Sequence, residues 1–279
     1  MTERAKKPSL VVVPQGVADL PVPTPASATD VMRAAIACSE RGVRAVMATV
    51  VERHGSAPGT PGQKLLLADD GTCAGSVGGG AVERAVLEAL VTALRDPKAK
   101  HGVRTFQLGP ELGMCCGGRL EVLIEPLLAL VPCLVVGGGH VATAVAPLLA
   151  RVGFAVTVVD PREAWSAEDR IAGVRVVNGD HDDVEADPRG VCIVMTHDHA
   201  LDQRAIEWAL KKKFAYVGGI GSRAKAERTR RRLEAKGFSE EDRARVRMPI
   251  GLDFGARLPD EIAVAIAGEL IAWRKARQG

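Results

Sequence analysis

The chain of 279 residues is 47% hydrophobic and 25% charged, which is the composition of a globular protein of about two domains. Its net charge of +3 is too small to imply a polyanionic partner. An aromatic content of 3% argues further against a surface that stacks nucleic-acid bases, so we expect no nucleic-acid partner.

The apolar runs and the cysteine spacing indicate the cellular compartment of the protein. No apolar run is long enough to span a membrane, and Pro14 interrupts the run Leu10–Val13 before it reaches the length of a signal-peptide core. Six cysteines occur without a Cys-x-x-Cys spacing, so neither a disulfide scaffold nor a structural zinc site is indicated. We expect a cytoplasmic protein with no membrane partner and no metal.

Proline and glycine divide the chain into a tail and two domains. Residues 1–28 carry several prolines without a sustained apolar period, which predicts a disordered tail. Thr29 or Asp30 is a suitable N-cap for the first helix. We expect an α/β protein with a smaller α+β domain over residues 29–126, a linker over Leu127–Pro132, and a Rossmann-like parallel sheet over residues 132–279.

A glycine-rich turn opens the second predicted helix. Gly78, Gly79 and Gly80 lead directly into Ala81–Leu94, which has an apolar stripe at helical spacing. Backbone N–H groups at such a helix start form a natural cradle for an anion. The alternative is a tight strand-to-helix connection that needs glycine for steric reasons only.

Two adjacent thiols, Cys115 and Cys116, are the strongest chemical signal in the first domain. They precede Gly117 and Gly118 and lie between strand-like runs at Val103–Leu108 and Leu120–Glu125, which predicts a looped hairpin. Exposure near the basic Arg119 lowers a thiol pKa, so both cysteines are candidate catalytic residues. The two cysteines, Gly117 and Gly118 are also predicted cofactor contacts. The alternative is that they are ordinary small residues in a tight turn.

The second domain opens with a dinucleotide-binding pattern. An apolar strand is followed by Gly137-Gly138-Gly139-His140 and a helix, and the next strand ends in Asp160. In this pattern, glycines receive a pyrophosphate and the acidic residue binds a ribose hydroxyl, which favours NAD over NADP. The predicted cofactor contacts are Gly137, Gly139, His140 and Asp160. Many such domains bind no dinucleotide, so occupancy stays open.

Two further polar loops follow predicted strands of the same sheet. Thr196 and His197 are candidates for cofactor binding, and His197 and His199 are candidates for acid–base work. The alternative is a strand-end cap in which Asp198 or Asp202 orients a histidine. Gly221, Ser222 and Arg223 open another helix and form a second candidate anion site.

Taken together, these motifs resemble the XdhC/CoxI family of xanthine dehydrogenase accessory proteins. The matching segments are Gly55–Pro58, Gly75–Glu83, Leu108–Pro110, Cys115–Gly118, Val136–Ala142, Thr196–Asp202, Tyr216–Ser222 with Lys225, and Pro249–Leu252. The match extends over nearly all of the chain from Asp30 to Trp273, and its Cys-Cys-Gly-Gly element is similar to the XdhC branch. Gly59 departs from the family pattern, because many members carry an arginine there.

The resemblance implies a chaperone that binds molybdenum cofactor (molybdopterin), protects it, supports its sulfuration and inserts it into an apo molybdenum hydroxylase subunit of the xanthine dehydrogenase type. It also implies that Cys115 and Cys116 face the cofactor or a sulfur donor, with a cysteine desulfurase as a second partner. The residues agree with this chemistry, because backbone N–H groups suit the phosphate and thiolates suit the metal end of the cofactor.

Two other functions remain open from the sequence. The first is an NAD-dependent oxidoreductase that uses His197 or His199 as its acid–base group. The second is a non-catalytic scaffold that dimerises through the last predicted helix, Asp260–Lys275, which is apolar around more than one face. We expect an accessory protein rather than a stand-alone enzyme, and we expect a homodimer.

Overall fold

The computed structural model describes residues 20–96, 98–108, 118–167 and 170–278. The chain divides into two compact units, Met1–Leu130 and Val131–Gly279, and each has its own sheet and hydrophobic core. None of the described helices is long and apolar enough to cross a membrane.

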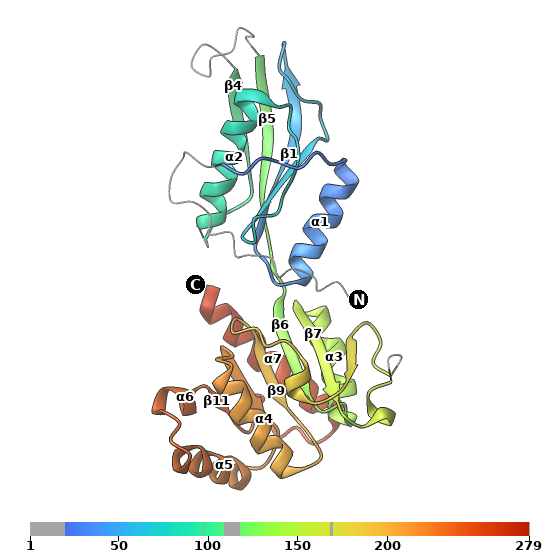
Figure 1. Cartoon of the computed structure of the whole chain (residues 1–279), viewed down its shortest axis with the longest axis vertical. Coiled ribbons are helices and arrows are strands. Elements are labelled where there is room, and N and C mark those ends of the chain that lie inside the picture. The colour runs from blue at the N-terminus through green and yellow to red at the C-terminus, as the bar shows by residue number, and fades with distance from the viewer. Residues whose placement is uncertain (1–19, 97, 109–117, 168–169, 279) are drawn as a thin grey trace, which may run out of the picture. The chain divides into compact units, whose positions relative to one another are not determined.

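The first unit is an antiparallel sheet of five strands with a helix on each face (Figure 1). Its elements in chain order are α1 (Ala28–Glu40), β1 (Ala45–His54), β2 (Lys64–Ala68), β3 (Cys73–Gly75), α2 (Gly80–Arg95), β4 (Gly102–Leu108) and β5 (Gly118–Leu127). The strand order is β3-β2-β1-β5-β4. The apolar stripe of α2, which includes Val82, Val86 and Leu90, packs on one face of the sheet. Val31 and Cys38 of α1 pack on the other face.

The segment before α1 differs from the sequence prediction. Leu20 packs against the core of the first unit. The backbone of Thr24 donates to Cys73 and accepts from Gly75, with both hydrogen bonds at 2.9 Å. Ser27, rather than Thr29 or Asp30, caps α1. Residues 20–28 are therefore ordered and not part of a disordered tail, because extended, proline-containing backbone can pair at the free edge of a sheet.

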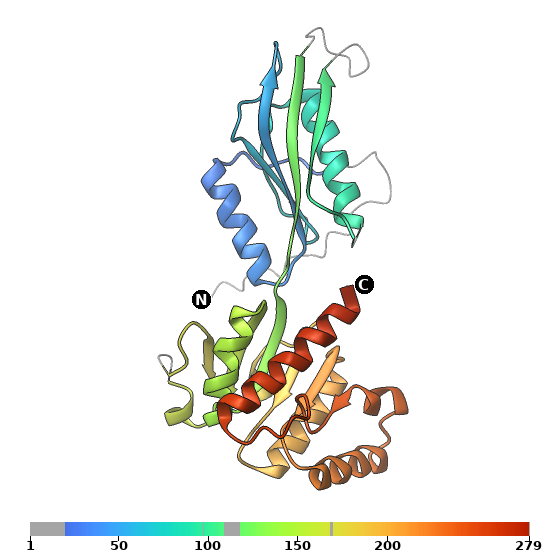
Figure 2. The same cartoon turned by 180° about the vertical axis from the view of Figure 1, so that it is seen from behind.

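The second unit is a parallel sheet of six strands (Figure 2). Its strands are β6 (Val131–Val136), β7 (Phe154–Asp160), β8 (Arg175–Asn178), β9 (Val191–Val194), β10 (Tyr216–Gly219) and β11 (Val246–Arg247). Its helices are α3 (His140–Arg151), η2 (Glu163–Trp165), η3 (His181–Asp183), α4 (His199–Lys211), α5 (Arg223–Ala235), α6 (Glu240–Ala244) and α7 (Pro259–Gln278). The order β11-β10-β9-β6-β7-β8 is that of a Rossmann fold, which confirms the predicted fold class. Because β5 and β6 extend into the predicted linker, residues 128–130 alone connect the two sheets.

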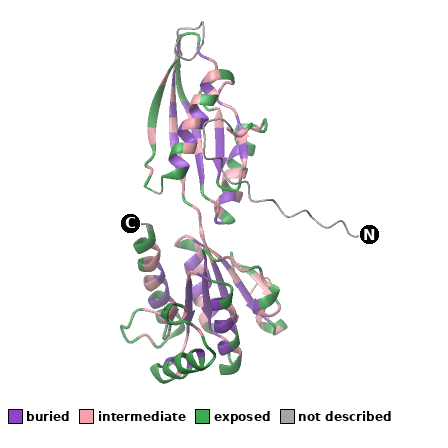
Figure 3. Ribbon diagram, turned by 60° about the vertical axis from the view of Figure 1, so that its left-hand side comes forward, coloured by how far each residue is buried: buried purple, intermediate pink, exposed green. Residues whose placement is uncertain are grey.

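Helices cover both faces of the parallel sheet, and the burial pattern in Figure 3 follows from this layering. The core on one face includes residues of α3 and α7, and the core on the other face includes residues of α4 and α5. In α7, Ile266 and Leu270 are fully buried, whereas Val264 is 57% exposed. The last helix therefore has an apolar side chain outside the core, and the expected homodimer stays a prediction.

Candidate functional site

The glycine turn before α2 packs closely on the loop that follows β1. Gly78 has a φ of +124°, and a Cβ atom at this position would lie 2.6 Å from the amide nitrogen of Gly59. No side chain fits between the two loops, so glycine is required at position 78. Gly78 therefore has the steric role that was the alternative to anion binding for this glycine turn.

The start of α2 is open to a ligand. Its N-cap residue, Gly79, provides no side-chain hydrogen bond, and nothing beyond the chain neighbours lies within 4 Å of a Cβ atom built on Gly79 or Gly80. The first N–H groups of a helix have no partner inside the helix and carry the positive end of its dipole. The backbone at Gly79 and Gly80 can therefore receive an anionic group such as a phosphate.

Glu83 engages the neighbouring donors of the same turn. Its Oε2 accepts from the Ser76 hydroxyl at 2.5 Å and from the Val77 N–H at 3.3 Å. The Ser76 hydroxyl in turn accepts from the Gly78 N–H at 3.1 Å. The donors on this side of the turn are thus satisfied by the chain itself, so a ligand anion has to bind at Gly79 and Gly80.

The base of the β4–β5 hairpin lies against the same loop. Leu108 and Gly118 pair across the two strands, which confirms the predicted hairpin strands. A Cβ atom on Gly118 would lie 2.7 Å from the amide nitrogen of Ala57 and 2.9 Å from the carbonyl oxygen of His54. The loop over residues 54–59 therefore contacts both the glycine turn and the base of the hairpin. The predicted site residues Cys115, Cys116 and Gly117 lie outside the described residues.

The four described cysteines are not candidates for thiol chemistry. All of them are free and buried: Cys38, Cys73, Cys133 and Cys192. Burial raises the pKa of Cys73 to about 11 and that of Cys133 to about 12, and it also raises the pKa of Cys38 and Cys192. Such thiols stay protonated at neutral pH and are poor nucleophiles. The prediction of a reactive thiol therefore remains with Cys115 and Cys116.

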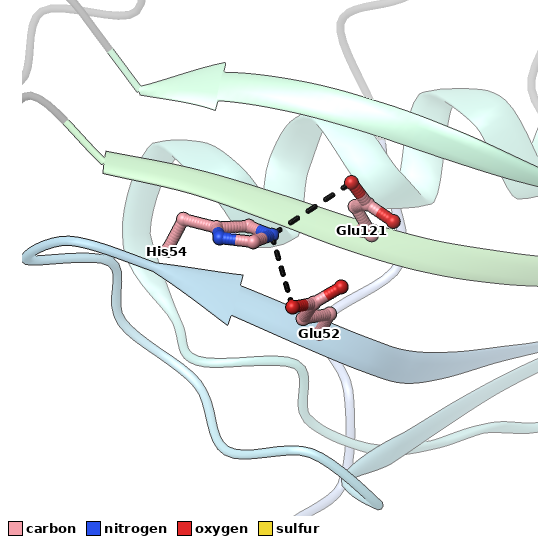
Figure 4. A group of neighbouring side chains, drawn as sticks. All are labelled: Glu52, His54 and Glu121. Carbon is pink, nitrogen blue, oxygen red and sulfur yellow. Dashed lines mark ion pairs between the residues drawn. The ribbon is translucent and has the colours of Figure 1, made fainter.

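A charged cluster that the sequence analysis missed lies at the ends of β1 and β5 (Figure 4). Nε2 of His54 is 3.4 Å from Oε1 of Glu52 and 3.8 Å from Oε1 of Glu121. Nη2 of Arg119 is 2.9 Å from the same imidazole nitrogen and 3.3 Å from Oε1 of Glu121. The register between the strands shifts at Val51, so strict alternation could not predict this cluster. The one feature of the local sequence that points to this cluster is the run of polar residues at the end of β1.

In the second unit, the carboxylate of Asp160 is fully engaged by the chain. It accepts from the N–H groups of Gly138 at 2.8 Å and Arg162 at 3.0 Å, and from Nε and Nη2 of Arg162 at 2.9 and 2.6 Å. Burial alone would raise the pKa of this carboxyl group, but the hydrogen bonds from Arg162 and Gly138 outweigh burial and lower it. A ribose hydroxyl at this position would have to displace Arg162.

The crevice beside Asp160 is narrow. The cavity lined by Gly137, Asp160, Thr196 and His197 has a volume of about 20 Å³, which is room for one water molecule. The carbonyl oxygen of Trp165 lies 2.4 Å from a Cβ atom built on Gly138, so η2 covers the glycine loop. The ring of exposed His140 contacts the Trp165 ring edge to face, with centroids 5.2 Å apart. Gly139 forms the N-cap of α3 without a side-chain hydrogen bond.

The loop after β9 caps the next helix, as the structural alternative predicts, but neither Asp198 nor Asp202 forms a hydrogen bond with the ring of His197 or His199. The N–H and hydroxyl of Thr196 donate to Oδ1 of Asp202 at 2.9 and 2.7 Å, and Asp198 caps α4. His197 and His199 are exposed, and neither imidazole makes a hydrogen bond to another described residue. Without a partner that orients either ring, this loop gives no support for acid–base catalysis.

The turn before α5 borders a larger cavity. Ser222 caps α5 by accepting from the Lys225 N–H at 3.2 Å, so its hydroxyl is engaged. Gly221, Arg223 and the loop over residues 249–256 line a cavity of about 350 Å³, which is within the range of small-molecule sites. Arg223 pairs with Asp253 at 2.7 Å at this cavity, so an anionic ligand would compete with Asp253 for the guanidinium.

Two family models match the chain. The XdhC Rossmann domain matches residues 133–270, and the XdhC and CoxI family matches residues 38–107. The Rossmann-domain match lies within the second unit and includes the parallel sheet and its crevice, and the family match over residues 38–107 lies within the first unit.

Three curated relatives are similar to this chain. The uncharacterized protein YqeB of Escherichia coli K12 is 32% identical over 81% of this chain and 42% of its own length. A probable xanthine dehydrogenase subunit of Bacillus subtilis 168 is 30% identical over 50% of this chain and 42% of its own length. The molybdenum cofactor insertion chaperone PaoD of Escherichia coli K12 is 24% identical over 88% of both chains. The matched region thus spans less than half the length of YqeB and of the Bacillus protein.

Proposed function

Because the chain belongs to the XdhC and CoxI family, we propose that it is a chaperone that binds molybdenum cofactor and serves the maturation of a xanthine dehydrogenase-type molybdenum hydroxylase. The similarity to PaoD supports this proposal, because PaoD is named a molybdenum cofactor insertion chaperone and the similarity extends over 88% of both chains. The cofactor is cargo in this proposal, and the chain itself is an accessory protein rather than a stand-alone enzyme.

The structural observation that carries the proposal is the open start of α2. The cofactor is an anionic pterin phosphate with a soft, sulfur-rich metal end, so its binding site needs N–H donors and thiolates. Gly79 and Gly80 fit the phosphate, since their surroundings are open and the helix start has no side-chain cap. We assign the metal or its transferable sulfur to Cys115 and Cys116, which precede Gly118 by three and two residues in the sequence.

The finer steps of the proposal concern what happens to the cargo. The chain protects the cofactor, supports its sulfuration with a cysteine desulfurase as the sulfur source, and inserts it into the apo hydroxylase subunit. Thiolates suit the sulfuration step because they are nucleophiles and soft ligands. The proposal also includes a cytoplasmic location and a homodimer, and it is the exposure of Val264 on α7 that supports the homodimer.

A dinucleotide is not part of the proposed function. Asp160 is bound by Arg162, and the adjoining cavity has a volume of about 20 Å³, so neither feature supports the binding of NAD. The Rossmann order of the second unit fixes the fold, but the fold alone does not imply NAD binding. The oxidoreductase alternative also depends on His197 or His199, and no described residue orients either ring by a hydrogen bond.

The proposal is tested by transfer of the cofactor to its client. The purified chain is loaded with molybdenum cofactor and mixed with an apo xanthine dehydrogenase, and the xanthine-oxidising activity is measured over time. We expect the wild-type chain to activate the apoenzyme. The Cys115→Ala/Cys116→Ala variant should lose most of this activation, because it lacks both soft ligands.

The matched control is Cys38→Ala, which removes a buried thiol in the same unit. This variant should activate the apoenzyme as the wild type does. Full activation by the double variant would contradict the role of the two thiols. Absence of activation by the loaded wild type would contradict the chaperone function itself.

A further inference from the structure

We propose that Glu52, His54 and Glu121 form a binding site for a divalent first-row metal ion, with Mn²⁺ and Zn²⁺ as the ions that suit its ligands (Figure 4). One ligand atom from each residue lies within 4.8 Å of the other two. The sequence predicts no metal in this protein. The site is independent of the function proposed above.

A bulge in β1 creates the site. Val50 pairs with Val122 and Glu52 pairs with Glu121, so Val51 is an extra residue on its strand. In a regular strand, residues 50, 52 and 54 would share one face, and Val50 is buried in the core. The extra residue moves Glu52 and His54 to the opposite face, where they meet Glu121. This placement brings two carboxylates and an imidazole together from two neighbouring strands.

The separation of His54 from each carboxylate is close to that of two atoms sharing one ion. Two ligand atoms bound to the same metal at about 2.1 Å with a tetrahedral angle lie about 3.4 Å apart. Nε2 of His54 is 3.4 Å from the Glu52 oxygen and 3.8 Å from the Glu121 oxygen. Both separations are longer than an ordinary hydrogen bond. The cluster therefore needs little rearrangement to coordinate a metal.

The contact between His54 and Arg119 suits the tautomer that a metal requires. A guanidinium nitrogen only donates, so the 2.9 Å contact with Nη2 of Arg119 makes Nε2 of His54 the acceptor. In the tautomer that accepts from Arg119, the nitrogen that faces the two carboxylates carries its lone pair. Arg119 occupies the position of a cation, and a metal ion would replace it there.

The charges of the cluster also favour a divalent ion. Glu52 and Glu121 lie directly opposite each other, and like charges in such a pair are destabilising. Arg119 supplies one positive charge for two carboxylates. The side chains of Glu52 and His54 are 58% and 38% exposed, so an ion can enter from solvent. The ligand set contains no sulfur, which suits Mn²⁺ as well as Zn²⁺.

Titration of the full chain with Mn²⁺ tests the proposal. Mn²⁺ is the suitable probe because it binds carboxylate and imidazole but binds thiolates poorly, which excludes the cysteines from the measurement. The free ion is measured by electron paramagnetic resonance. We expect saturable binding at one site in the wild type, and at least about tenfold weaker binding in Glu52→Gln and in Glu121→Gln. Pulsed spectra of the bound ion should show nitrogen coupling that disappears in His54→Gln.

Two control variants make the test specific. Glu125→Gln removes a carboxylate from the same strand at a position opposite Met47, outside the cluster, and should leave the affinity unchanged. Arg119→Met removes the competing cation and should bind Mn²⁺ at least as tightly as the wild type. The proposal is overturned if the wild type does not bind Mn²⁺, if Glu125→Gln weakens binding as Glu121→Gln does, or if Arg119→Met weakens it.

Discussion

The carboxylates of Asp160 and Asp187 are held in the same way, each by the arginine two residues later. In both Asp-Pro-Arg segments, the arginine donates its N–H, Nε and Nη2 to the aspartate. The Asp160 side chain is 2% exposed and also accepts from Gly138, whereas the Asp187 side chain is 27% exposed. Two identical tripeptides thus differ in how deeply the aspartate is buried, and the tripeptide sequence does not reveal this difference. The burial of the aspartate determines how much each ion pair contributes to stability.

The Asp160→Asn substitution should lower the free energy of unfolding by about 2–3 kcal/mol at pH 7. An amide group cannot accept on both of its atoms, so one donor of Arg162 or Gly138 would face an NH₂ group. Urea denaturation measures the difference. Asp187→Asn is the matched control and should cost less than about 1 kcal/mol, because its pair is more exposed.

The effect of Asp160→Asn should depend on pH. The folded pKa of Asp160 is lowered from the ordinary value of 3.8, so the ionised carboxylate stabilises the fold above that pH. This contribution is lost as the pH falls through the lower, folded pKa. The difference between wild type and Asp160→Asn should therefore shrink below pH 3.8. Equal costs for the two asparagine variants, or a difference that persists in acid, would contradict this role of Asp160.

At the scale of elements, β1 changes character along its length. From Val46 to Val50 its residues alternate in burial, and it pairs regularly with β2 and β5. After Val50 the register shifts, and the side chains on the polar face are those of Glu52 and His54. The sequence could not predict this shift, because a bulge depends on the partner strand. The contacts of Glu52 and His54 with Glu121 and Arg119 therefore result from the pairing of β1 with β5.

Deletion of Val51 should be tolerated, although deletions within strands usually reverse the faces of a sheet. Without the extra residue, β1 becomes regular and Glu52 still pairs with Glu121. We expect a loss of about 1 kcal/mol in the free energy of unfolding, measured by thermal denaturation followed by circular dichroism.

Deletion of Ala48 is the control for this prediction. Ala48 is fully buried and pairs with both Leu65 and Ile124, so its removal should unfold the first unit. If deletion of Val51 were as damaging as deletion of Ala48, the bulge would not be the feature that sets the two faces of β1.

For the whole molecule, local patterns were sufficient to predict the fold class. The buried apolar strands β6, β7 and β9, together with the helices α3 and α4 that follow β6 and β9, predict a parallel sheet, and the structure confirms it. The details of the sites required long-range information. Arg162 folds back onto Asp160, and Trp165 covers Gly138, so the crevice is closed by residues whose positions depend on the folded chain. The sequence identifies the glycine loops, but it does not show which of them is accessible to a ligand in the folded chain.

The central claim is that an anionic cargo binds at the open start of α2. The direct measurement is the amount of molybdenum and pterin bound per chain after anaerobic gel filtration with molybdenum cofactor. Gly80 has a φ of +60°, a conformation that Asn and Asp tolerate, so Gly80→Asn and Gly80→Asp form a matched pair. We expect the wild type and Gly80→Asn to retain the cofactor and Gly80→Asp to bind it at least about tenfold more weakly, because its carboxylate repels the phosphate. Equal retention by both variants, or no binding by the wild type, would contradict the claim.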